Sequence, residues 1–275
     1  MNVINEIPDI VFEKHVVAFI DILGFKRFIK EAEQTGTKES KQFKLLLDVV
    51  SQNHAFKNEL EHNIYLPEEM GLECRQISDS FIITAPCSKT TDKLPTLIAV
   101  SIKAIQIYQA LLSIGLGARG GIAVGNLFVK DKNIFGSAFT DAYETESVKA
   151  IYPRILLHQS AVTELNELQQ YKYRRDSLFA KLDDVIFLDS FFDLTLVSTN
   201  SEDIVTKLKA FKECIEINLK NSLELKIRNK WSWVALHFNA HLDYYPLDVA
   251  KIKIESIFPI QLDYLNPSDP YWMSI

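Results

Sequence analysis

The sequence predicts an α/β (α+β) fold with a ferredoxin-like βαββαβ core, in which helices pack on one mixed or antiparallel sheet. Strand-like and helix-like segments follow one another as β-α-α-β-β-α-β-β-α-β over residues 16–157. Two βαβ-like halves of that order contain an antiparallel hairpin. Helical periodicity returns between residues 204 and 239 and predicts a C-terminal helical extension.

The first predicted strand, Val16–Asp21, has five apolar residues followed by one carboxylate, and Gly24 lies three residues further on. A short apolar run that ends near a glycine is typical of a buried strand entering a turn. A carboxylate at the end of a buried strand costs free energy unless something compensates it. Asp21 therefore either binds a metal ion beside a phosphate-binding turn or caps the helix that begins near Gly24.

A helical pattern then covers Gly24–Asn58, with a break at Glu33–Ser40. Two strands, Gly71–Ser78 and Ser80–Ala85, follow as a hairpin whose turn contains Asp79. Asp79 is thus the second acid placed at the end of an apolar strand. An aspartate at a turn can equally hydrogen-bond its own backbone, so this position alone leaves both interpretations open.

A long amphipathic helix is predicted over Leu94–Ile114, and the strand after it, Ala118–Gly125, contains three glycines. Glycines within a strand often mark the close approach of another backbone or a ligand. Their spacing fits neither the G-x-G-x-x-G of a dinucleotide fold nor a P-loop. We expect a short strand and turn at Asn126–Lys132, a helix after Gly136 and a strand at Ile155–Leu157.

The remaining predicted elements are a helix and charged link at 158–182, a strand at Val185–Phe192, helices at Ile204–Asn221 and Asn229–Asn239, and an irregular tail from Tyr244. His237 and His241 are four residues apart but lack the glutamate of an H-E-x-x-H zinc site. We interpret both histidines as surface or packing residues.

The composition limits the class of protein. A chain of 275 residues allows one large domain, which we divide into a leader (1–14), a core (15–200) and C-terminal helices with a tail packed on the core (201–275). The net charge of −6 argues against a nucleic-acid-binding surface. No uninterrupted apolar run approaches the roughly 20 residues of a membrane span. Three cysteines without paired spacing predict neither disulfides nor a zinc site, so we expect a cytoplasmic protein.

Four segments, in the order in which they occur, resemble the class III nucleotidyl cyclases. That family shows F-x-D-I-x-G-F and I-G-D early in its domain, then an arginine before small strand residues, and then a glycine that opens a helix. The matching segments are Phe19–Phe25, Ile77–Ser80, Arg119–Gly125 and Gly136–Phe139. The resemblance covers residues 16–157 and implies a cyclase catalytic domain at 15–200.

The resemblance implies a two-metal site with Mn²⁺ or Mg²⁺ as the cofactor. Asp21 and Asp79 carry over as the catalytic metal ligands, together with Ile22. The residues that carry over as nucleotide-binding, through their backbone amides, are Ile22, Leu23, Gly24 and Phe25.

Two further positions carry over as base-reading residues, namely Arg75, four residues before Asp79, and Asn133, three before Gly136. Adenylate cyclases usually have Lys and Asp at these positions, and guanylate cyclases have Glu and a small residue. An arginine can reach a carbonyl oxygen of a smaller base, and an asparagine can both donate and accept. The pair favours a pyrimidine substrate, with UTP preferred to CTP. Arg75 could equally be a solvent-exposed strand residue without a role in binding.

The sequence departs from the family at two positions of the later helix. An asparagine and an arginine normally contact the transition state there, and this chain has Thr140 and Glu144. Positive charge must then come from elsewhere. We predict Arg154 to be catalytic, with Lys149 and Lys230 as further candidates.

These segments, together with Tyr152–Arg154 and a C-terminal K-W-x-W helix, resemble the bacterial pyrimidine cyclases of Pycsar anti-phage systems. That resemblance implies a homodimer with sites at the subunit interface, which makes cUMP or cCMP for a separate effector. The main alternative is a catalytically degenerate nucleotide-binding or interaction module on the same fold, and an adenylate or guanylate cyclase is another. A diguanylate cyclase would carry G-G-[DE]-[DE]-F at the hairpin, which Ser78–Phe81 does not match.

Overall fold

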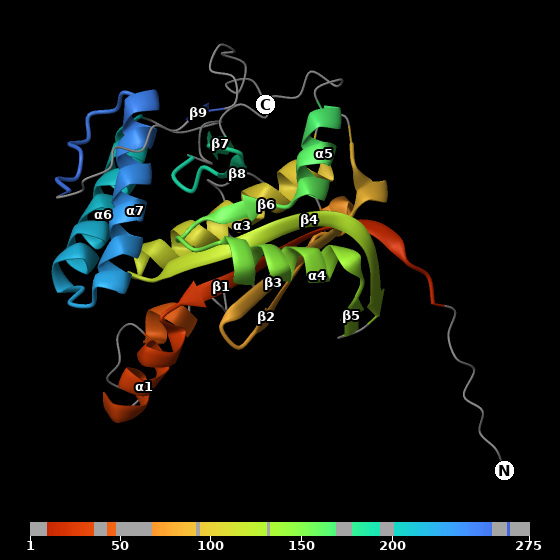
Figure 1. Cartoon of the computed structure of the whole chain (residues 1–275), viewed down its shortest axis with the longest axis horizontal. Helices are drawn as coiled ribbons and strands as arrows, with labels where there is room; N and C mark the ends of the chain where they lie inside the picture. The colour runs from red at the N-terminus through yellow and green to blue at the C-terminus, as the bar shows by residue number, and fades with distance from the viewer. Residues whose placement is uncertain are drawn as a thin grey trace.

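The strands form one sheet in the order β2-β3-β1-β4-β6-β8-β7-β9, with β5 paired to β4 (Figure 1). The computed structural model describes residues 10–35, 43–47, 68–91, 94–130, 133–168, 178–192, 201–254 and 263–264. The strands are β1 (Glu13–Leu23), β2 (Glu73–Ile77), β3 (Ser80–Pro86), β4 (Gly117–Lys130), β5 (Asn133–Phe135), β6 (Ile155–Leu157), β7 (Phe179–Leu182), β8 (Val185–Leu188) and β9 (Asp263–Tyr264). The α-helices are α1 (Phe25–Thr35), α3 (Thr96–Ser113), α4 (Ser137–Glu144), α5 (Gln159–Glu167), α6 (Ser201–Asn221) and α7 (Leu225–Tyr244).

The predicted fold class is confirmed by the pairing of the first four strands. Strands β2, β3, β1 and β4 are neighbours in that order, and all three pairs are antiparallel. With α1 and α3 in the connections, this is the βαββαβ arrangement. Strand β6 then joins β4 in parallel, so the sheet is mixed.

Side chains that alternate along β1 divide the core into two layers. Ile20 and Ile22 belong to the larger apolar cluster with α3, whereas Val17 and Phe19 belong to a smaller cluster with α4. Figure 1 shows α3 and α4 on opposite faces of the sheet. Asp21 follows Phe19 by two residues and therefore lies on the α4 face.

Helix α3 is the central helix of the larger layer. The sequence predicted an amphipathic helix, but residues on nearly every side of α3 are buried, because sheet and helices surround it. Within the described ranges, α3 alone is long and apolar enough to cross a membrane by length and composition, and 83% of its 18-residue window is buried inside the protein.

Strand β4 is longer than the sequence predicted. It runs without interruption over Gly117–Lys130, and β5 pairs with its far end, so the separate strand predicted at Asn126–Lys132 was wrong. The predicted role of its glycines is confirmed for Gly121. A Cβ atom on Gly121 would lie 2.3 Å from the carbonyl oxygen of Ala142 in α4. Only a glycine lets the helix approach the strand so closely.

The N-terminal elements agree with the sequence. The β2–β3 hairpin is confirmed, with Asp79 in its turn beside Ser78, whose φ is 56°. Helix α1 begins directly after Gly24 and ends within the predicted break. Residues 43–47 are helical, and the rest of the second predicted helix lies outside the described residues, as do residues 1–9 of the predicted leader.

The predicted C-terminal helices are confirmed, whereas the strands that precede them were predicted only in part. Helices α6 and α7 cover the predicted ranges and lie side by side (Figure 1). The segment Phe179–Leu182 was predicted as part of a charged link, but it forms strand β7. It pairs with β8, which the sequence did predict as a strand, and with β9, which it did not. Strand β8 ends at Leu188 rather than Phe192, since the backbone turns at Asp189, whose carboxylate accepts a hydrogen bond from the Phe191 N–H at 3.1 Å.

Candidate functional site

Asp21 and Asp79 lie at neighbouring strand ends. Asp21 is opposite Ser80 of β3, and Asp79 occupies the turn just before that strand. The Ile22 N–H donates to the Asp79 carbonyl oxygen at 2.9 Å and ties the two ends together. The charges of the two carboxylates interact. The fold therefore brings together the two aspartates that the sequence predicted as metal ligands.

Asp21 is incompletely compensated. Burial raises the pKa of its carboxyl group, and the negative charge of Asp79 adds to the rise. Arg119, opposite Asp21 on β4, counteracts this rise with its Nε 3.5 Å from the Asp21 Oδ2. Because the pKa remains above its usual value, an additional cation near Asp21 would favour the ionised form.

A third carboxylate, Glu146, shares Arg119 with Asp21. The Arg119 Nε lies 2.6 Å from the Glu146 Oε1, and the Glu146 side chain is only 4% exposed. A π-helical turn, Thr145–Lys149, carries this glutamate. Burial raises the pKa of Glu146 to about 7 against the attraction of Arg119, and Asp21 and Asp79 contribute to the rise. The cluster therefore has two carboxylates that share one guanidinium, and the charge of Asp79 acts on both carboxylates.

The turn between β1 and α1 leaves open space at its glycine. Gly24 has a φ of +77°, which favours glycine, and a Cβ atom there would meet nothing within 4 Å. The first turn of α1 has no acidic side chain. The unpaired N–H groups at a helix start attract anions. The predicted phosphate contacts Ile22, Leu23, Gly24 and Phe25 thus occupy a turn that is chemically suited to a phosphate group.

The donors at Asp21 and Asp79 fit a divalent ion that shares its coordination with a substrate. Mg²⁺ usually keeps several waters and is bound through one or two carboxylates plus substrate phosphates. Two carboxylates and the adjacent Ile22 backbone match that need. Among the described residues, no group of three or more His, Cys, Asp or Glu side chains could enclose a metal. The pair therefore suits a shared site better than a structural metal centre.

The predicted base-reading residue Arg75 lies on the same face of the sheet as Asp21. It is opposite Ile82 in the hairpin, and Ile82 belongs to the apolar cluster of the α4 face. The Arg75 Nη2 donates to the Glu73 Oε2 at 2.6 Å on the same strand. Strands β2 and β1 are separated by β3 alone, so about 10 Å separates their backbones.

Asn133, the other predicted base-reading residue, lies far from Asp21 within one chain. It is opposite Lys130 at the end of β4, whereas Asp21 is opposite Arg119 near the beginning. The stretch of β4 between these two positions is roughly 35 Å long at the usual rise per residue. A single chain does not bring Asn133 and Asp21 to one nucleotide.

Arg154, the predicted catalytic arginine, lies in an aromatic cluster. Its guanidinium is 5.8, 5.5 and 5.5 Å from the ring centroids of Tyr152, Phe187 and Trp233. Such contacts stabilise a cation. Within the described part of the chain, no hydrogen bond or ion pair joins Arg154 to Asp21. Its catalytic role stays a prediction, and the aromatic surroundings favour a packing role instead.

The other candidates for positive charge differ in position. Lys230 on α7 is near enough to Asp21 for their charges to interact. Lys149 lies in the π-helical turn that follows α4, and its side chain is exposed. Thr140 and Glu144, at the positions where the family has transition-state contacts, lie within α4 and are also exposed. Helix α7 therefore brings the most distant candidate in the sequence to the acidic cluster.

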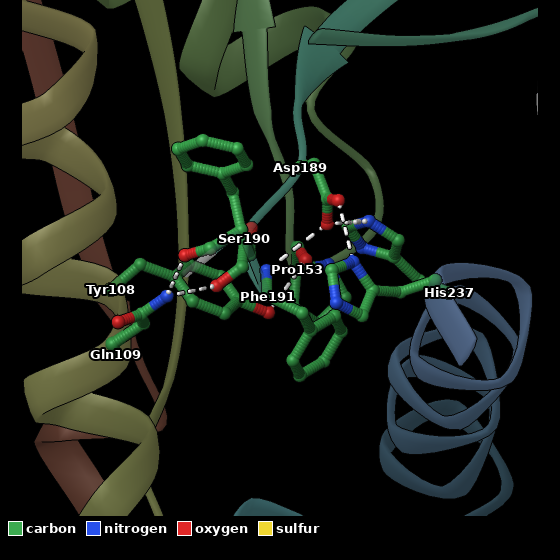
Figure 2. A network of polar contacts seen from close by, with 9 residues as sticks. Tyr108, Gln109, Pro153, Asp189, Ser190, Phe191 and His237 are labelled. Carbon is green, nitrogen blue, oxygen red and sulfur yellow. Dashed lines mark hydrogen bonds and ion pairs between the residues drawn. The ribbon is translucent and has the colours of Figure 1, made fainter. Parts of the chain in front are cut away.

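A second polar cluster, which the sequence did not predict, is buried between β8 and α7 (Figure 2). Asp189 accepts hydrogen bonds from His237 Nε2 at 3.1 Å and from His241 Nδ1 at 2.7 Å. Burial alone would raise the pKa of Asp189, but the two histidines outweigh it and hold this pKa below its usual range. Of the two predicted possibilities, surface or packing residues, the structure confirms packing, since both histidines are buried. Their hydrogen bonds to Asp189, which anchor α7, were not predicted.

No protein-family model and no curated protein matches the chain. Among solved structures, the chain is similar to the monomeric guanylyl cyclase domain of the RhoGC fusion protein from the aquatic fungus Blastocladiella emersonii, with 16% identity and a TM-score of 0.44, over 64% of this chain and 95% of that one. It is also similar to the catalytic core of a rhodopsin–guanylyl cyclase with converted specificity in complex with ATPαS, with 13% identity and a TM-score of 0.38, over 64% and 95% of the two chains. Likeness this distant assigns no function, so the function has to be inferred from the residues of the site.

Proposed function

We propose that this protein is a nucleotidyl cyclase of the class III type that converts UTP or CTP into the 3′,5′-cyclic monophosphate and pyrophosphate. The observation that carries the proposal is the pair Asp21 and Asp79 at adjacent strand ends, joined by the 2.9 Å backbone hydrogen bond from Ile22. The same two aspartates are the centre of the sequence resemblance to this family.

In the proposed reaction, the ribose 3′-hydroxyl loses its proton to water and its oxygen forms a bond to the α-phosphorus. The bond from the α-phosphorus to the oxygen bridging to the β-phosphate breaks, and pyrophosphate leaves with that oxygen. Asp21, Asp79 and the Ile22 backbone would hold the divalent ions, Mn²⁺ or Mg²⁺, which would acidify the hydroxyl and neutralise the triphosphate. Both aspartates must be ionised for this binding. The turn at Gly24 and the N–H groups at the start of α1 orient the phosphates.

A second copy of the chain supplies the base-reading residue Asn133 in this proposal. Since Asn133 and Asp21 lie toward opposite ends of β4, a head-to-tail pair related by a two-fold axis brings Asn133 of one copy to Asp21 of the other and forms two equivalent sites. The exposed side chains of Phe135 on β5 and Tyr143 on α4 supply apolar surface for such a contact.

Mixing two inactive variants tests the shared site. In a heterodimer of Asp21→Asn and Asn133→Ala, one site carries both changes and the other carries neither. Random exchange of subunits should therefore restore about one quarter of the wild-type activity. If each chain forms a site on its own, mixing restores nothing. A monomer that stays fully active at high dilution would also contradict the shared site.

The pyrimidine preference rests on Arg75 and Asn133, since a guanidinium donates to a base carbonyl and an amide can donate or accept. Purified protein is incubated with Mn²⁺ and each of the four nucleoside triphosphates, and the products are identified by mass spectrometry. We expect cUMP as the main product. A cyclic purine nucleotide as the main product would contradict the pyrimidine assignment but not the cyclase.

A nucleotide-binding module without catalysis is the second candidate. It is favoured by the ion pair of Arg119 with Asp21, which already compensates part of the metal-binding charge, and by Thr140 and Glu144 at the family's transition-state positions. Tight nucleotide binding without any cyclic product in the four-nucleotide assay would establish this alternative.

From the resemblance to the Pycsar cyclases, we propose that the product is a second messenger in bacterial anti-phage defence, made in the cytoplasm and sensed by a separate effector. Infected cells that carry the wild-type gene should accumulate cUMP or cCMP and survive. Cells with Asp79→Asn should do neither. Protection by Asp79→Asn would contradict a messenger role.

A further inference from the structure

A cavity of about 240 Å³ lies beside the end of β1, between α1 and the α6–α7 hairpin. Leu23 and Gly24 line it from the β1 end, Arg27 from α1, and Lys230 and Trp231 from α7. Leu23 follows Asp21 by two residues on the same strand, so the cavity begins about 7 Å along β1 from the acidic cluster. The C-terminal hairpin thus forms one wall of the space next to the proposed site.

The charge in this cavity comes mainly from Lys230. Arg27 also lines it, but its Nε is 3.1 Å from the Glu31 Oε1, so its charge is largely balanced. Within the described ranges, Lys230 has no carboxylate at ion-pair distance. Burial lowers the pKa of Lys230, and the positive charge of Arg119 adds to this effect, while Asp21 opposes it. An anion in the cavity would relieve both unfavourable effects.

The size of the cavity suits part of a nucleotide rather than all of it. Sites for whole drug-sized ligands are usually about 300–1,000 Å³, and this cavity has about 240 Å³. A phosphate chain is narrow, and it needs cationic and N–H donors more than apolar walls. Gly24, where a Cβ atom would meet nothing within 4 Å, lines the cavity three residues after Asp21.

Helix α7 holds Lys230 in place. Trp231 and Trp233 are 8% and 3% exposed, so this turn of the helix is packed into the core. One and two turns further on, His237 and His241 are hydrogen-bonded to buried Asp189 (Figure 2). A cation on a helix fixed in this way needs little reorganisation to meet a ligand.

We infer that Lys230 contacts the phosphate chain of the nucleoside triphosphate, so that the C-terminal hairpin is part of the nucleotide site. The identity of the ligand rests on the proposed cyclase function. Lys230 supplies, from the same chain as Asp21, positive charge that Thr140 and Glu144 cannot supply. Its charge neutralises the phosphates that depart as pyrophosphate.

The test measures binding without turnover. Inorganic tripolyphosphate is titrated into the full-length protein and followed by calorimetry and by intrinsic tryptophan fluorescence, to which Trp231 in the cavity wall contributes. Lys230→Met, which keeps an apolar stem, should weaken binding about tenfold or more, because it removes a charge-assisted contact. Lys230→Arg should keep most of the affinity. Lys209→Met, an exposed lysine on α6, is the matched control and should bind like the wild type.

The outcomes separate this inference from the cyclase proposal. If Lys230→Met is folded by circular dichroism and binds tripolyphosphate like the wild type, the inference is overturned even if UTP is cyclised. No binding by the wild type also overturns it. If binding depends on Lys230 but no nucleotide is cyclised, the phosphate site stands and the cyclase proposal fails.

Discussion

The two carboxylate clusters of this protein have opposite electrostatic balance. In the first, Asp21 and Glu146 share Arg119, and burial together with neighbouring carboxylates raises their pKa values. In the second, the side chain of Asp189 is fully buried, and two histidines hold the pKa of its carboxyl group below the usual range. The difference follows from the number of donors around each carboxylate. The first cluster has room for another cation, and the second is complete without one.

The largest expected effect is on activity at the first cluster. Asp21→Asn and Asp79→Asn should each reduce cyclase turnover about 10³-fold, because loss of a metal ligand removes several kcal/mol of transition-state stabilisation. Thermal unfolding of Asp21→Asn should show a melting temperature equal to or above that of the wild type, since burial and the Asp79 charge leave the Asp21 carboxylate incompletely compensated. Retained turnover in either variant would show that the aspartates do not bind the catalytic metal.

The reverse pattern is expected at the second cluster. Asp189→Ala should reduce the free energy of unfolding by about 3–5 kcal/mol, because it leaves buried histidines without their acceptor. Chemical denaturation measures this change, and Asp248→Ala, at an exposed position, is the control. An unfolding free energy close to that of the wild type would mean that Asp189 does not anchor α7.

Glu146→Gln should have a moderate effect on metal binding. Without the glutamate charge, the Arg119 guanidinium pairs more strongly with Asp21, 3.5 Å away, and competes with the metal. Substitution of a residue that contacts a metal ligand commonly lowers metal affinity 10–100-fold. We expect the dissociation constant for Mn²⁺, measured by calorimetry, to rise about tenfold. An unchanged or tighter dissociation constant would contradict competition for Arg119.

Arg154→Met should separate packing from catalysis. Loss of the contacts with Tyr152, Phe187 and Trp233 should cost about 0.5–2 kcal/mol of unfolding free energy. We expect the remaining folded enzyme to keep most of its turnover. If the opposite is found, with full stability and no turnover, Arg154 acts directly in catalysis as the sequence predicted.

The smallest effect is a difference in pH dependence between the clusters. Burial lowers the pKa of His237, so His237 takes up a proton on unfolding and stability falls as pH drops below about 6.5. The raised pKa of Glu146, about 7, has the opposite sign, and stability falls as pH rises from about 4.5 through 7. Melting temperatures between pH 5 and 8 should therefore rise less with pH in His237→Gln and more in Glu146→Gln than in the wild type. Equal slopes in all three proteins would contradict these assignments.

The sequence predicts the core and the position of the aspartate pair well because both depend on local patterns. A strand that ends in Asp21 and a hairpin turn at Asp79 are visible in short apolar runs, and neighbouring strand ends meet at one sheet edge. The glycines of β4 likewise indicate a close approach, which α4 makes at Gly121.

Other parts of the two clusters depend on contacts between distant segments. Asp189 meets His237 and His241 across about fifty residues of chain, and the strand pattern before it gives no sign of this pairing. The position of Glu146 is visible in the sequence pattern, since it follows the buried residue Ala142 by four residues and so falls on the same helical face. A carboxylate on that apolar face indicates a buried partner, which proved to be Arg119.

Binding of Mn²⁺ in the presence of a non-hydrolysable UTP analogue tests the difference between the clusters most directly. Electron paramagnetic resonance counts bound Mn²⁺ in the wild type, in Asp21→Asn and Asp79→Asn, and in the exposed control Asp248→Asn. We predict that the wild type and the control bind Mn²⁺, and that both site variants lose this binding while they remain folded. Equal Mn²⁺ binding in all four proteins would contradict the assignment of Asp21 and Asp79 as the metal site.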